Sequence, residues 1–294
     1  MAKNLFVFDI ETIADTSSAS NLLSLDTASL SNQDIAKELE KYHLEITDGK
    51  NAFLRQPFHK VVCISYLYAK IEVIGGYEKY SFAHLGSAGS VEYTENSEKD
   101  LVEKFFAMID KYKPKLVSFN GKTFDFPVLK YRAMKYGIPS DYAYSGEGTY
   151  NGVNYSSRYN LKDHCDLIDA LSDFGASARI KLNEVCSIFG FPGKFGLDGS
   201  LVSEYFYQGK LKEIRDYCET DVLNTYLVYL RYALHTNKTS VEFYNEAILE
   251  LISFLKASNY QIYMDFLNAW LVAHNNLQTK DKQVKILDSF EPIF

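Results

Sequence analysis

NLFVFDIETIA, residues 4–14, decides how the fold begins. Leu5 to Phe8 are apolar on both faces, a pattern typical of a central strand that is covered above and below. Asp9 and Glu11 follow and project from one face of the same strand, because side chains alternate along it. Neighbouring carboxylates repel unless a cation lies between them, and hard oxygen ligands suit Mg²⁺ or Mn²⁺. A polar strand end that meets solvent would read the same, so this motif alone leaves both interpretations open.

A second polar cluster lies in SFNGKTFDFPVL, residues 118–129. Asn120 and Gly121 leave a short strand, and Asp125 falls in the first turn of a helix expected from about 124 to 136. In an α/β sheet, ligands bind at the carboxyl ends of strands, which is where this loop lies. An Asp is also favoured at any helix N-terminus, so a purely structural role stays open.

The third stretch is RDYCETDVLNTYLVYLRY, residues 215–232, within a helix expected over 211–234. Tyr217 and Asp221 are four residues apart and share a face, which continues with Asn224 and Thr225. The apolar positions between them face the core. A surface tyrosine and aspartate at this spacing would be unremarkable by themselves.

The remaining elements predict one α/β domain with helical additions. We expect strands over 60–68 and 71–83 joined by a turn near 69–71, and a helix over 98–113 that Pro114 ends. The polar excursion 15–57 carries a helix capped by Asn32 or Asp34. Further expectations are a loop or hairpin over 140–160, a strand over 161–168, a helix over 182–189, a turn over 189–200 and one or two helices over 240–275.

Composition sets broad limits on the protein class. The 294 residues are 47% hydrophobic, enough for a sizeable core. Four widely spaced cysteines form no CxxC pair, which favours free thiols in a reducing cytoplasm, and neither a signal peptide nor a membrane span is expected. The net charge of −7 is concentrated in residues 1–50, which hold four Lys or Arg against nine Asp or Glu. Charge therefore neither favours nor excludes a nucleic-acid partner.

Taken together, the motifs F-D-x-E-T, N-G-x-x-F-D and Y-x-x-x-D resemble those of the DEDD superfamily of 3′-5′ exonucleases. The tyrosine places the resemblance in the DEDDy subgroup, and within it the chain is similar to the stand-alone bacterial family related to the proofreading domain of family B DNA polymerases. HCDLIDALSDFGA (164–176) and LNEVCSIFGFPGKFGLDGSLVSEYF (182–206) also match that family. The resemblance runs from residue 4 to about 234 and implies a ribonuclease H-like fold, a mixed sheet flanked by helices. It implies an exonuclease domain over 1–235, interrupted at about 15–57, with a helical extension over 236–294 packed on it.

The resemblance also implies a mechanism. Asp9, Glu11, Asp125 and Asp221 would cluster around two divalent ions, Mg²⁺ or Mn²⁺, about 3.5–4 Å apart. Asp9 would bridge the ions, Asp221 would complete the site that activates water, and Asp125 would act through bound water. Glu11 would also meet the 3′-hydroxyl, and Tyr217 would orient the attacking water, since a phenol with an ordinary pKa near 10 is a poor base.

Substrate contacts are expected from Thr12, Asn120, Phe124, His164 and Lys194, although Phe124 could simply fill core and His164 could be structural. Phe195 follows Lys194 where a Walker A loop would need Ser or Thr. Five tyrosines among glycines either stack on single-stranded bases or belong to an ordinary loop: Tyr142, Tyr144, Tyr150, Tyr155 and Tyr159.

The expected substrate is nucleic acid with a free 3′ end, single-stranded or frayed DNA, which would be released as nucleoside 5′-monophosphates. An exoribonuclease with the same catalytic residues is the first alternative, since only contacts to the 2′-hydroxyl would differ. A non-catalytic nucleic-acid-binding domain is the second, and the intact acidic positions argue against it. A dinucleotide-dependent oxidoreductase lacks its glycine motif.

Overall fold

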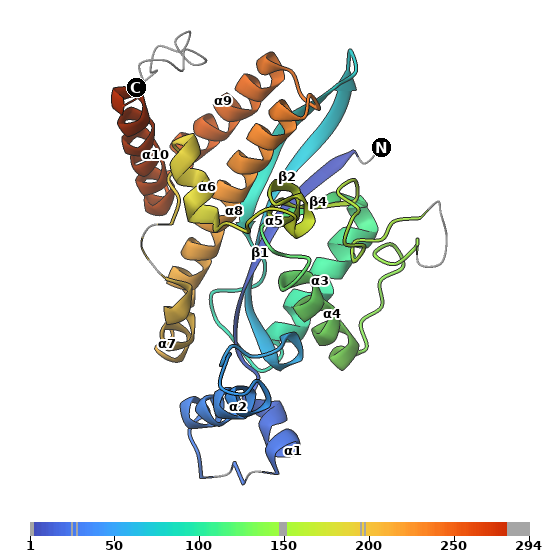
Figure 1. Ribbon diagram of the computed structural model, residues 1–294, viewed down its shortest axis with the longest axis vertical. Coiled ribbons are helices and arrows are strands. Elements are labelled where there is room, and N and C mark those ends of the chain that lie inside the picture. The colour runs from blue at the N-terminus through green and yellow to red at the C-terminus, as the bar shows by residue number, and fades with distance from the viewer. Residues whose placement is uncertain are drawn as a thin grey trace.

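A five-stranded mixed sheet forms the centre of the computed structural model, which describes residues 3–24, 26–27, 29–146, 152–194, 196 and 198–280. The strand order is β3-β2-β1-β4-β5, with β1 antiparallel to β2 and parallel to β4. The five strands are β1 (Asn4–Ala14), β2 (His59–Ile74), β3 (Tyr77–Ser87), β4 (Lys115–Ser118) and β5 (His164–Asp166). Helices cover both faces (Figure 1), so the expected ribonuclease H-like mixed sheet is confirmed.

The β2–β3 hairpin is longer than the sequence predicts. A turn near residues 69–71 was expected, but β2 continues to Ile74, and Gly75 and Gly76 make the turn with φ of 59° and 88°. Glycine adopts such angles without a steric penalty, whereas Lys70 and Ile71 pair in the ladder with Ser81 and Tyr80. The expectation was wrong because a Gly-Gly pair is a stronger turn signal than the lysine within the strand.

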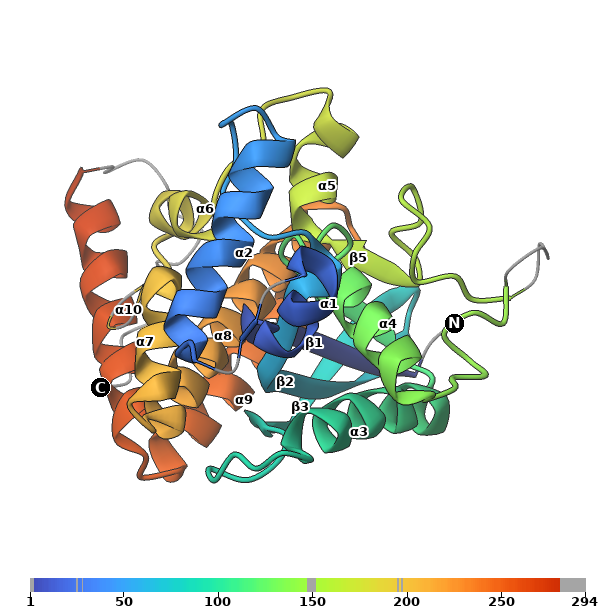
Figure 2. The ribbon, with the colours of Figure 1, turned by 90° about the horizontal axis from the view of Figure 1, so that it is seen from below.

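Two hydrophobic cores lie on opposite faces of the sheet. Leu5 and Val7 belong to the core that packs under α8 (Leu211–His235), α9 (Val241–Ala257) and α10 (Gln261–Lys280). Phe6 and Phe8 point to the other face, under α3 (Ser97–Tyr112) and α4 (Asp125–Tyr136). Figure 2 shows these layers from below, with α3 and α4 on one side of the strands and α8 and α9 on the other. Because odd positions of β1 face α8, Asp9 and Glu11 continue the row that points toward that helix.

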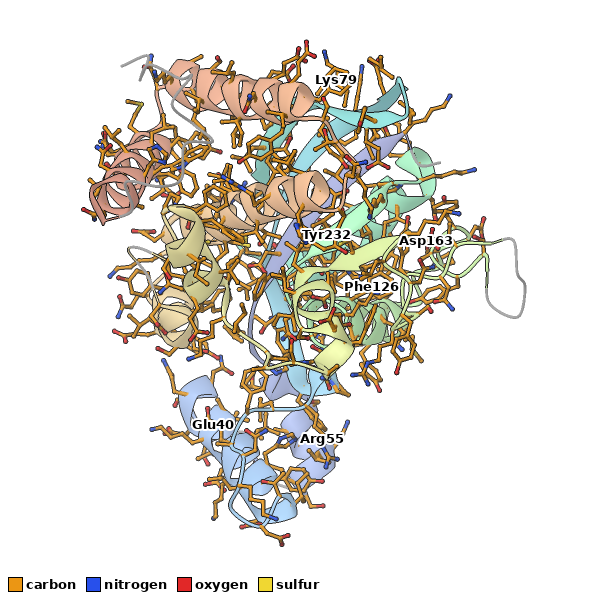
Figure 3. The ribbon with its side chains drawn as sticks, turned by 45° about the horizontal axis from the view of Figure 1, so that its top comes forward. Glu40, Arg55, Lys79, Phe126, Asp163 and Tyr232 are labelled. Carbon is orange, nitrogen blue, oxygen red and sulfur yellow. The ribbon has the colours of Figure 1, made fainter. Side chains whose placement is uncertain are left out.

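The excursion between β1 and β2 forms a small lobe at the end of β1. It contains η1 (Thr16–Ser18), α1 (Ala19–Leu23), α2 (Asn32–Ile46) and η2 (Gln56–Phe58), with its own core around Leu39. Figure 3 places Glu40 and Arg55 in this lobe, at the opposite end of the molecule from Lys79 in β3. The cap of α2 is Ser31, whose hydroxyl accepts from the Asp34 amide at 3.2 Å, and not Asn32 or Asp34 as expected. Serine is an equally good cap that stands one residue earlier.

The segments after β4 contain more short helices than the sequence predicts. The strand expected over 161–168 is only His164–Asp166, because Asp166 caps α5 (Leu167–Leu171) by accepting from the Ile168 amide. The helix over 182–189 is confirmed as α6 (Leu182–Phe189). In the described residues between β5 and α8, four short helices were not expected: α5, η3 (Asp173–Gly175), η4 (Gly199–Leu201) and α7 (Val202–Tyr207).

The last helices complete the face of the sheet that α8 covers. α9 packs on β3 and α8, and α10 packs on α9, which agrees with the one or two helices expected over 240–275. The division into a domain over 1–235 and an extension over 236–294 stays a prediction, and residues 281–294 lie outside the described part of the chain. Among the described residues, none of the helices has the length and apolar character needed to cross a bilayer.

Candidate active site

The two carboxylates of β1 form the centre of the site. Asp9 and Glu11 are partly buried, and a ligand atom of each lies within 4.8 Å of the other and of the Cys218 thiol. Their partners in the β1–β2 ladder are Ser65 and Cys63. A register shift between Glu11 and Thr12 breaks the ladder directly after the second carboxylate. Such bulges re-aim side chains, and they occur frequently next to active sites.

Asp125 lies beside these carboxylates, in the first turn of α4. It is 5% exposed, and its Oδ1 accepts a hydrogen bond from the backbone amide of Ile10 at 3.2 Å. That amide lies between Asp9 and Glu11 in the chain, so the bond brings the second motif to the first. Burial raises the pKa of Asp125 to about 7 despite the hydrogen bonds that lower it.

The loop before Asp125 is ordered by a residue that sequence reasoning missed. The Asp166 carboxylate accepts from the backbone amides of Asn120 and Lys122, both at 2.8 Å. Asn120 adopts a left-handed φ of 74°, and a Cβ at Gly121 would lie 2.4 Å from the Ser118 hydroxyl. The Asn-Gly pair is therefore required by the backbone path. Because β4 and β5 are parallel neighbours, an acidic residue at the end of β5 was the available signal.

Tyr217 and Asp221 reach the same site from α8. The expected shared face is confirmed, but neither is a surface residue: Tyr217 is 4% and Asp221 8% exposed. The Lys194 ammonium donates to the Tyr217 hydroxyl at 2.6 Å and lies 3.6 Å from Asp221 Oδ2. Asn224, on the same face, binds the backbone of Gly193 in both directions and so fixes the segment that carries Lys194.

Mutual repulsion and burial dominate the electrostatics of these acids. Burial, followed by the charges of Asp125 and Asp221, raises the pKa of Asp9 well above its usual range. Burial, then Asp9 and Asp221, do the same to the pKa of Glu11. The Lys194 charge lowers both pKa values but is outweighed. Shifts of this kind, with several acids sharing one site, are typical of functional centres.

Cys218 is the other residue of this group that the sequence did not single out. Its thiol lies 3.5 Å from the backbone oxygen of Asp9 and 3.6 Å from the Asp9 carboxylate. Burial raises the pKa of Cys218 well above its usual range, and the thiol pairs with the Cys63 side chain. Its position next to Tyr217 in the third motif was the only signal in the sequence. All four cysteines are buried free thiols, as expected.

The donor set fits divalent cations of the hard type. It consists of carboxylates of Asp9, Glu11, Asp125 and Asp221, which carry like charges into a largely buried space. Asp221 Oδ1 is buried and has no hydrogen-bond partner among the described residues. A buried carboxylate oxygen without a partner is costly unless a ligand completes it. These two observations fit a cation held between the acids.

Of the expected substrate contacts, Thr12 and Phe124 are half-buried and His164 is buried. Thr12 hydrogen-bonds the His59 ring at 2.9 Å, and Phe124 packs against His59 with ring centroids 4.8 Å apart. His164 has no exposed surface, and its ring nitrogens bond the Ser118 hydroxyl and the Tyr155 carbonyl. Burial lowers the pKa of His164 to about 3, so the ring is neutral. These contacts support the structural role for His164 and leave it no surface for a substrate.

The tyrosine-rich loop does not form a stacking platform in the described residues. Tyr155 is fully buried and donates to the Pro114 carbonyl, and Tyr142 packs on its ring with centroids 6.1 Å apart. Tyr144 lies against the same core, whereas Tyr159 is 72% exposed. Tyr150 lies outside the described residues. Tyr142, Tyr144 and Tyr155 therefore belong to the hydrophobic core on this face of the sheet. The sequence did not show this, because the glycines between the tyrosines are typical of an exposed loop.

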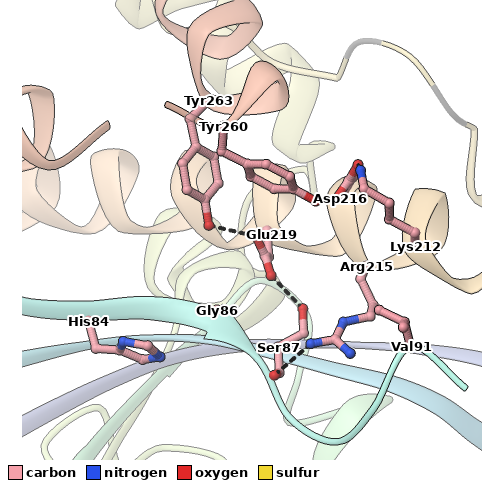
Figure 4. A pocket seen from close by; sticks show the side chains of 10 residues that line it. All are labelled: His84, Gly86, Ser87, Val91, Lys212, Arg215, Asp216, Glu219, Tyr260 and Tyr263. Carbon is pink, nitrogen blue, oxygen red and sulfur yellow. Dashed lines mark hydrogen bonds and ion pairs between the residues drawn. The ribbon is translucent and has the colours of Figure 1, made fainter. Parts of the chain in front are cut away.

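A separate pocket of about 350 Å³ lies on the opposite face of α8 (Figure 4). There Glu219 accepts from the Ser87 and Tyr263 hydroxyls, each at 2.7 Å, and Arg215 donates to the Ser87 carbonyl. Asp216 is paired with Lys212 at 2.7 Å. The charged groups of this pocket thus hold β3, α8 and α10 together, and none of the four acids of the site lines it.

Comparison with known proteins assigns most of the chain to one family. The chain matches, over residues 51–270, the family described as predicted 3′-5′ exonucleases related to the exonuclease domain of PolB. That range holds Asp125, Tyr217 and Asp221, whereas Asp9 and Glu11 precede it.

Individual relatives are polymerases that are much longer than this chain. The chain is 26% identical over 136 residues to a DNA polymerase of Archaeoglobus fulgidus, covering 45% of the chain and 17% of the polymerase. It is 27% identical over 149 residues to the catalytic chain of DNA polymerase epsilon from Eremothecium gossypii, covering 48% of this chain and 6% of that one. The structure of the family B DNA polymerase from Pyrobaculum calidifontis aligns with a TM-score of 0.47 at 18% identity, over 86% of this chain and 29% of that one. With three quarters of its length inside the family match, the chain belongs to the predicted 3′-5′ exonucleases related to the exonuclease domain of PolB.

Proposed function

We propose that this protein is a metal-dependent 3′-5′ exonuclease that removes nucleoside 5′-monophosphates from single-stranded or frayed DNA 3′ ends. One observation carries the proposal: acids from three distant segments, Asp9 and Glu11, Asp125, and Asp221, interact with one another in one site beside Tyr217. Membership of the family supports the reaction class, and the polymerase relatives favour DNA over RNA.

Asp9, Glu11 and Asp221 would hold one divalent ion, and Asp9 with Asp125 a second, Mg²⁺ or Mn²⁺. When bound, such ions supply Lewis-acid stabilisation of the scissile phosphate and lower the pKa of water. The high pKa values of the four acids fit this role, because a cation between them relieves the repulsion that otherwise keeps protons on them.

Tyr217 would orient the attacking water. Burial, followed by the charges of Asp221 and Glu11, raises the pKa of its hydroxyl far above the usual range near 10. The phenol therefore stays protonated at neutral pH and acts by hydrogen bonding, because it is too weak an acid to exist as phenolate. This agrees with the role that the third motif implies.

The remaining polar residues would position the 3′ end. Glu11 would accept a hydrogen bond from the terminal 3′-hydroxyl. Lys194 is more than a third exposed and is the cation next to Tyr217 and Asp221, so it would attract the scissile phosphate. Asn120, a half-buried residue in the loop that Asp166 orders, would contact the sugar-phosphate backbone.

The test is cleavage of 5′-labelled DNA and RNA oligonucleotides by the purified protein with Mg²⁺ or Mn²⁺. We expect a descending ladder on DNA that EDTA and Asp9→Ala both abolish. Asp34→Ala is the matched control, since Asp34 is an exposed acid of α2, and this variant should keep full activity. Activity that persists in Asp9→Ala, or products that shorten from the 5′ end, would overturn the proposal, and a ladder on RNA alone would reassign the substrate.

A further inference from the structure

Phe53 is an exposed aromatic side chain at the edge of the site. It is 61% exposed and lies in the lobe between β1 and β2, after α2. Its ring centroid is 5.4 Å from that of Phe124 and 5.1 Å from that of His59. One side of the ring thus packs on the protein, and most of its surface faces solvent.

This cluster is connected to the catalytic segments on two sides. Phe124 directly precedes Asp125, and His59 hydrogen-bonds the hydroxyl of Thr12, which follows Glu11. Gln56 from the same lobe donates to the carbonyl of Thr123 at 2.9 Å. Phe53 therefore contacts Phe124, the residue directly before Asp125.

Hydrogen bonds fix the backbone of Phe53 before any ligand arrives, and His59 and Phe124 pack on its ring. Its amide donates to the Asn51 side chain at 2.9 Å, and its carbonyl bonds His43 Nδ1 at 3.1 Å. The next residue, Leu54, is 6% exposed and packs in the core of the lobe. Little conformational freedom is left to lose on binding, which favours affinity.

Arg55 is the next exposed residue after Phe53. Phe53 and Arg55 are exposed on either side of buried Leu54, so both project outward from this short segment. Arg55 has an extended backbone, with φ of −70° and ψ of 154°. Proteins that bind single-stranded nucleic acids combine aromatic rings, on which bases stack, with cationic side chains that contact phosphates. Phe53 and Arg55 offer this combination two residues apart.

We infer that Phe53 is a stacking platform for one of the last two bases of a single-stranded 3′ end, with Arg55 beside it for the backbone. The inference rests on the proposed function, because it assigns the upstream wall of the same site. Stacking on a ring is sequence-tolerant, which suits an enzyme that must degrade any sequence. The lobe of residues 15–58 thus contributes a substrate contact that none of the three acidic motifs supplies.

Binding can be tested without catalysis by tryptophan fluorescence. The chain has one tryptophan, Trp270 in α10, so Phe53→Trp in a Trp270→Phe background places a single reporter at the platform. Single-stranded oligonucleotide added in EDTA should quench this reporter strongly. Tyr131→Trp in the same background is the control, since Tyr131 is an exposed aromatic of α4 at 42%. Quenching absent at position 53, or equal at both positions, would overturn the inference.

Cleavage then shows which group the ring contacts. Phe53→Ala should reduce kcat/KM about tenfold on single-stranded DNA, as expected from the loss of one stacked base. Phe53→Trp should keep the wild-type value, whereas Phe53→Leu should resemble Phe53→Ala. Tyr131→Ala should be unchanged.

Substrates with an abasic terminal or penultimate nucleotide complete a double-mutant cycle between the Phe53 ring and the base it stacks on. On one of them Phe53→Ala and wild type should be equally slow, because the base that the ring stacks on is missing. A tenfold loss that persists on both would instead indicate a folding or packing role and overturn the inference. Failure of the proposed function would look different, because the wild-type protein would then be inactive on every substrate.

Discussion

At the residue scale, the Tyr217 hydroxyl accepts a hydrogen bond from the Lys194 ammonium at 2.6 Å and faces the charges of Asp221, Glu11 and Asp9. The carboxylates keep the phenol protonated, and the Lys194 ammonium holds its oxygen in place. The spacing Y-x-x-x-D predicted that Tyr217 and Asp221 share a helix face, and this is confirmed. The sequence did not predict their burial, because they share a polar face with Asn224 and Thr225, and such a face usually meets solvent, whereas the fold buries it.

Replacing Tyr217 with Phe should lower kcat about 10²-fold with little change in KM, since misplacing the attacking water costs about this much. Steady-state kinetics on a single-stranded oligonucleotide provide the measurement. Tyr226→Phe is the matched control: Tyr226 is a buried tyrosine of α8 whose hydroxyl has no hydrogen-bond partner among the described residues. A raised KM with unchanged kcat in Tyr217→Phe would instead assign Tyr217 to substrate binding.

At the scale of elements, a buried ion-pair network fixes α4 against the end of β1. The Arg132 guanidinium, 2% exposed, bridges Asp15 at 2.6 Å and Glu98 of α3. Glu98 also accepts from the Val61 amide of β2 at 2.7 Å. Since α4 begins at Asp125, this network sets where that carboxylate stands relative to β1. None of these residues is in a recognised motif, and the sequence did not indicate that they meet.

We expect Arg132→Met to lower the free energy of unfolding by about 3–5 kcal/mol, because two buried carboxylates lose the guanidinium that lies between them. Urea unfolding followed by circular dichroism measures this. Lys37→Met removes an exposed pair with Asp34 and should change stability by less than about 1 kcal/mol. Equal effects of the two substitutions would mean that the buried network contributes no more than a surface pair.

Acid should reveal the same network. Burial raises the pKa of Asp15, but Arg132 and the Ser17 hydroxyl outweigh it and bring the pKa to about 2. Asp15 therefore contributes stability above its unfolded pKa near 4, and this contribution is lost as the pH falls toward 2. In Arg132→Met that portion of the acid-induced loss should be smaller.

At the scale of the whole molecule, four segments of the chain meet at one site, which holds four carboxylates and one ammonium group. β1 supplies Asp9 and Glu11, α4 supplies Asp125, α8 supplies Asp221, and the segment after α6 supplies Lys194. The folded chain keeps protons on these acids at pH values where the unfolded chain has released them. Without a cation, the site therefore opposes folding as the pH rises.

Asp125→Asn should become relatively more stable as the pH rises from 5 to 8 in EDTA. The folded pKa of Asp125 is about 7 and its unfolded value is near 4, so the wild type loses this stability between those values while the variant does not. Buried histidines have the opposite dependence below about pH 6.5, but they cancel in the difference between the two proteins. Thermal unfolding at each pH measures the difference, and Mg²⁺ should raise the melting temperature of the wild type more than that of the variant. A pH-independent difference would mean that Asp125 is ionised throughout.

The sequence by itself determined the local elements and the chemical types at the site. The apolar run of β1, the Asn-Gly turn before Asp125 and the four-residue spacing on α8 are local patterns, and local sterics and periodicity are legible along the chain. The tertiary structure alone decided which partners these residues meet: Asp166 under the second motif, Cys218 beside Asp9, Arg132 between Asp15 and Glu98, and Phe53 against Phe124. Such contacts join residues far apart in the chain, where no spacing rule applies. They arise only when the sheet order brings β1, β4, β5 and α8 to one place.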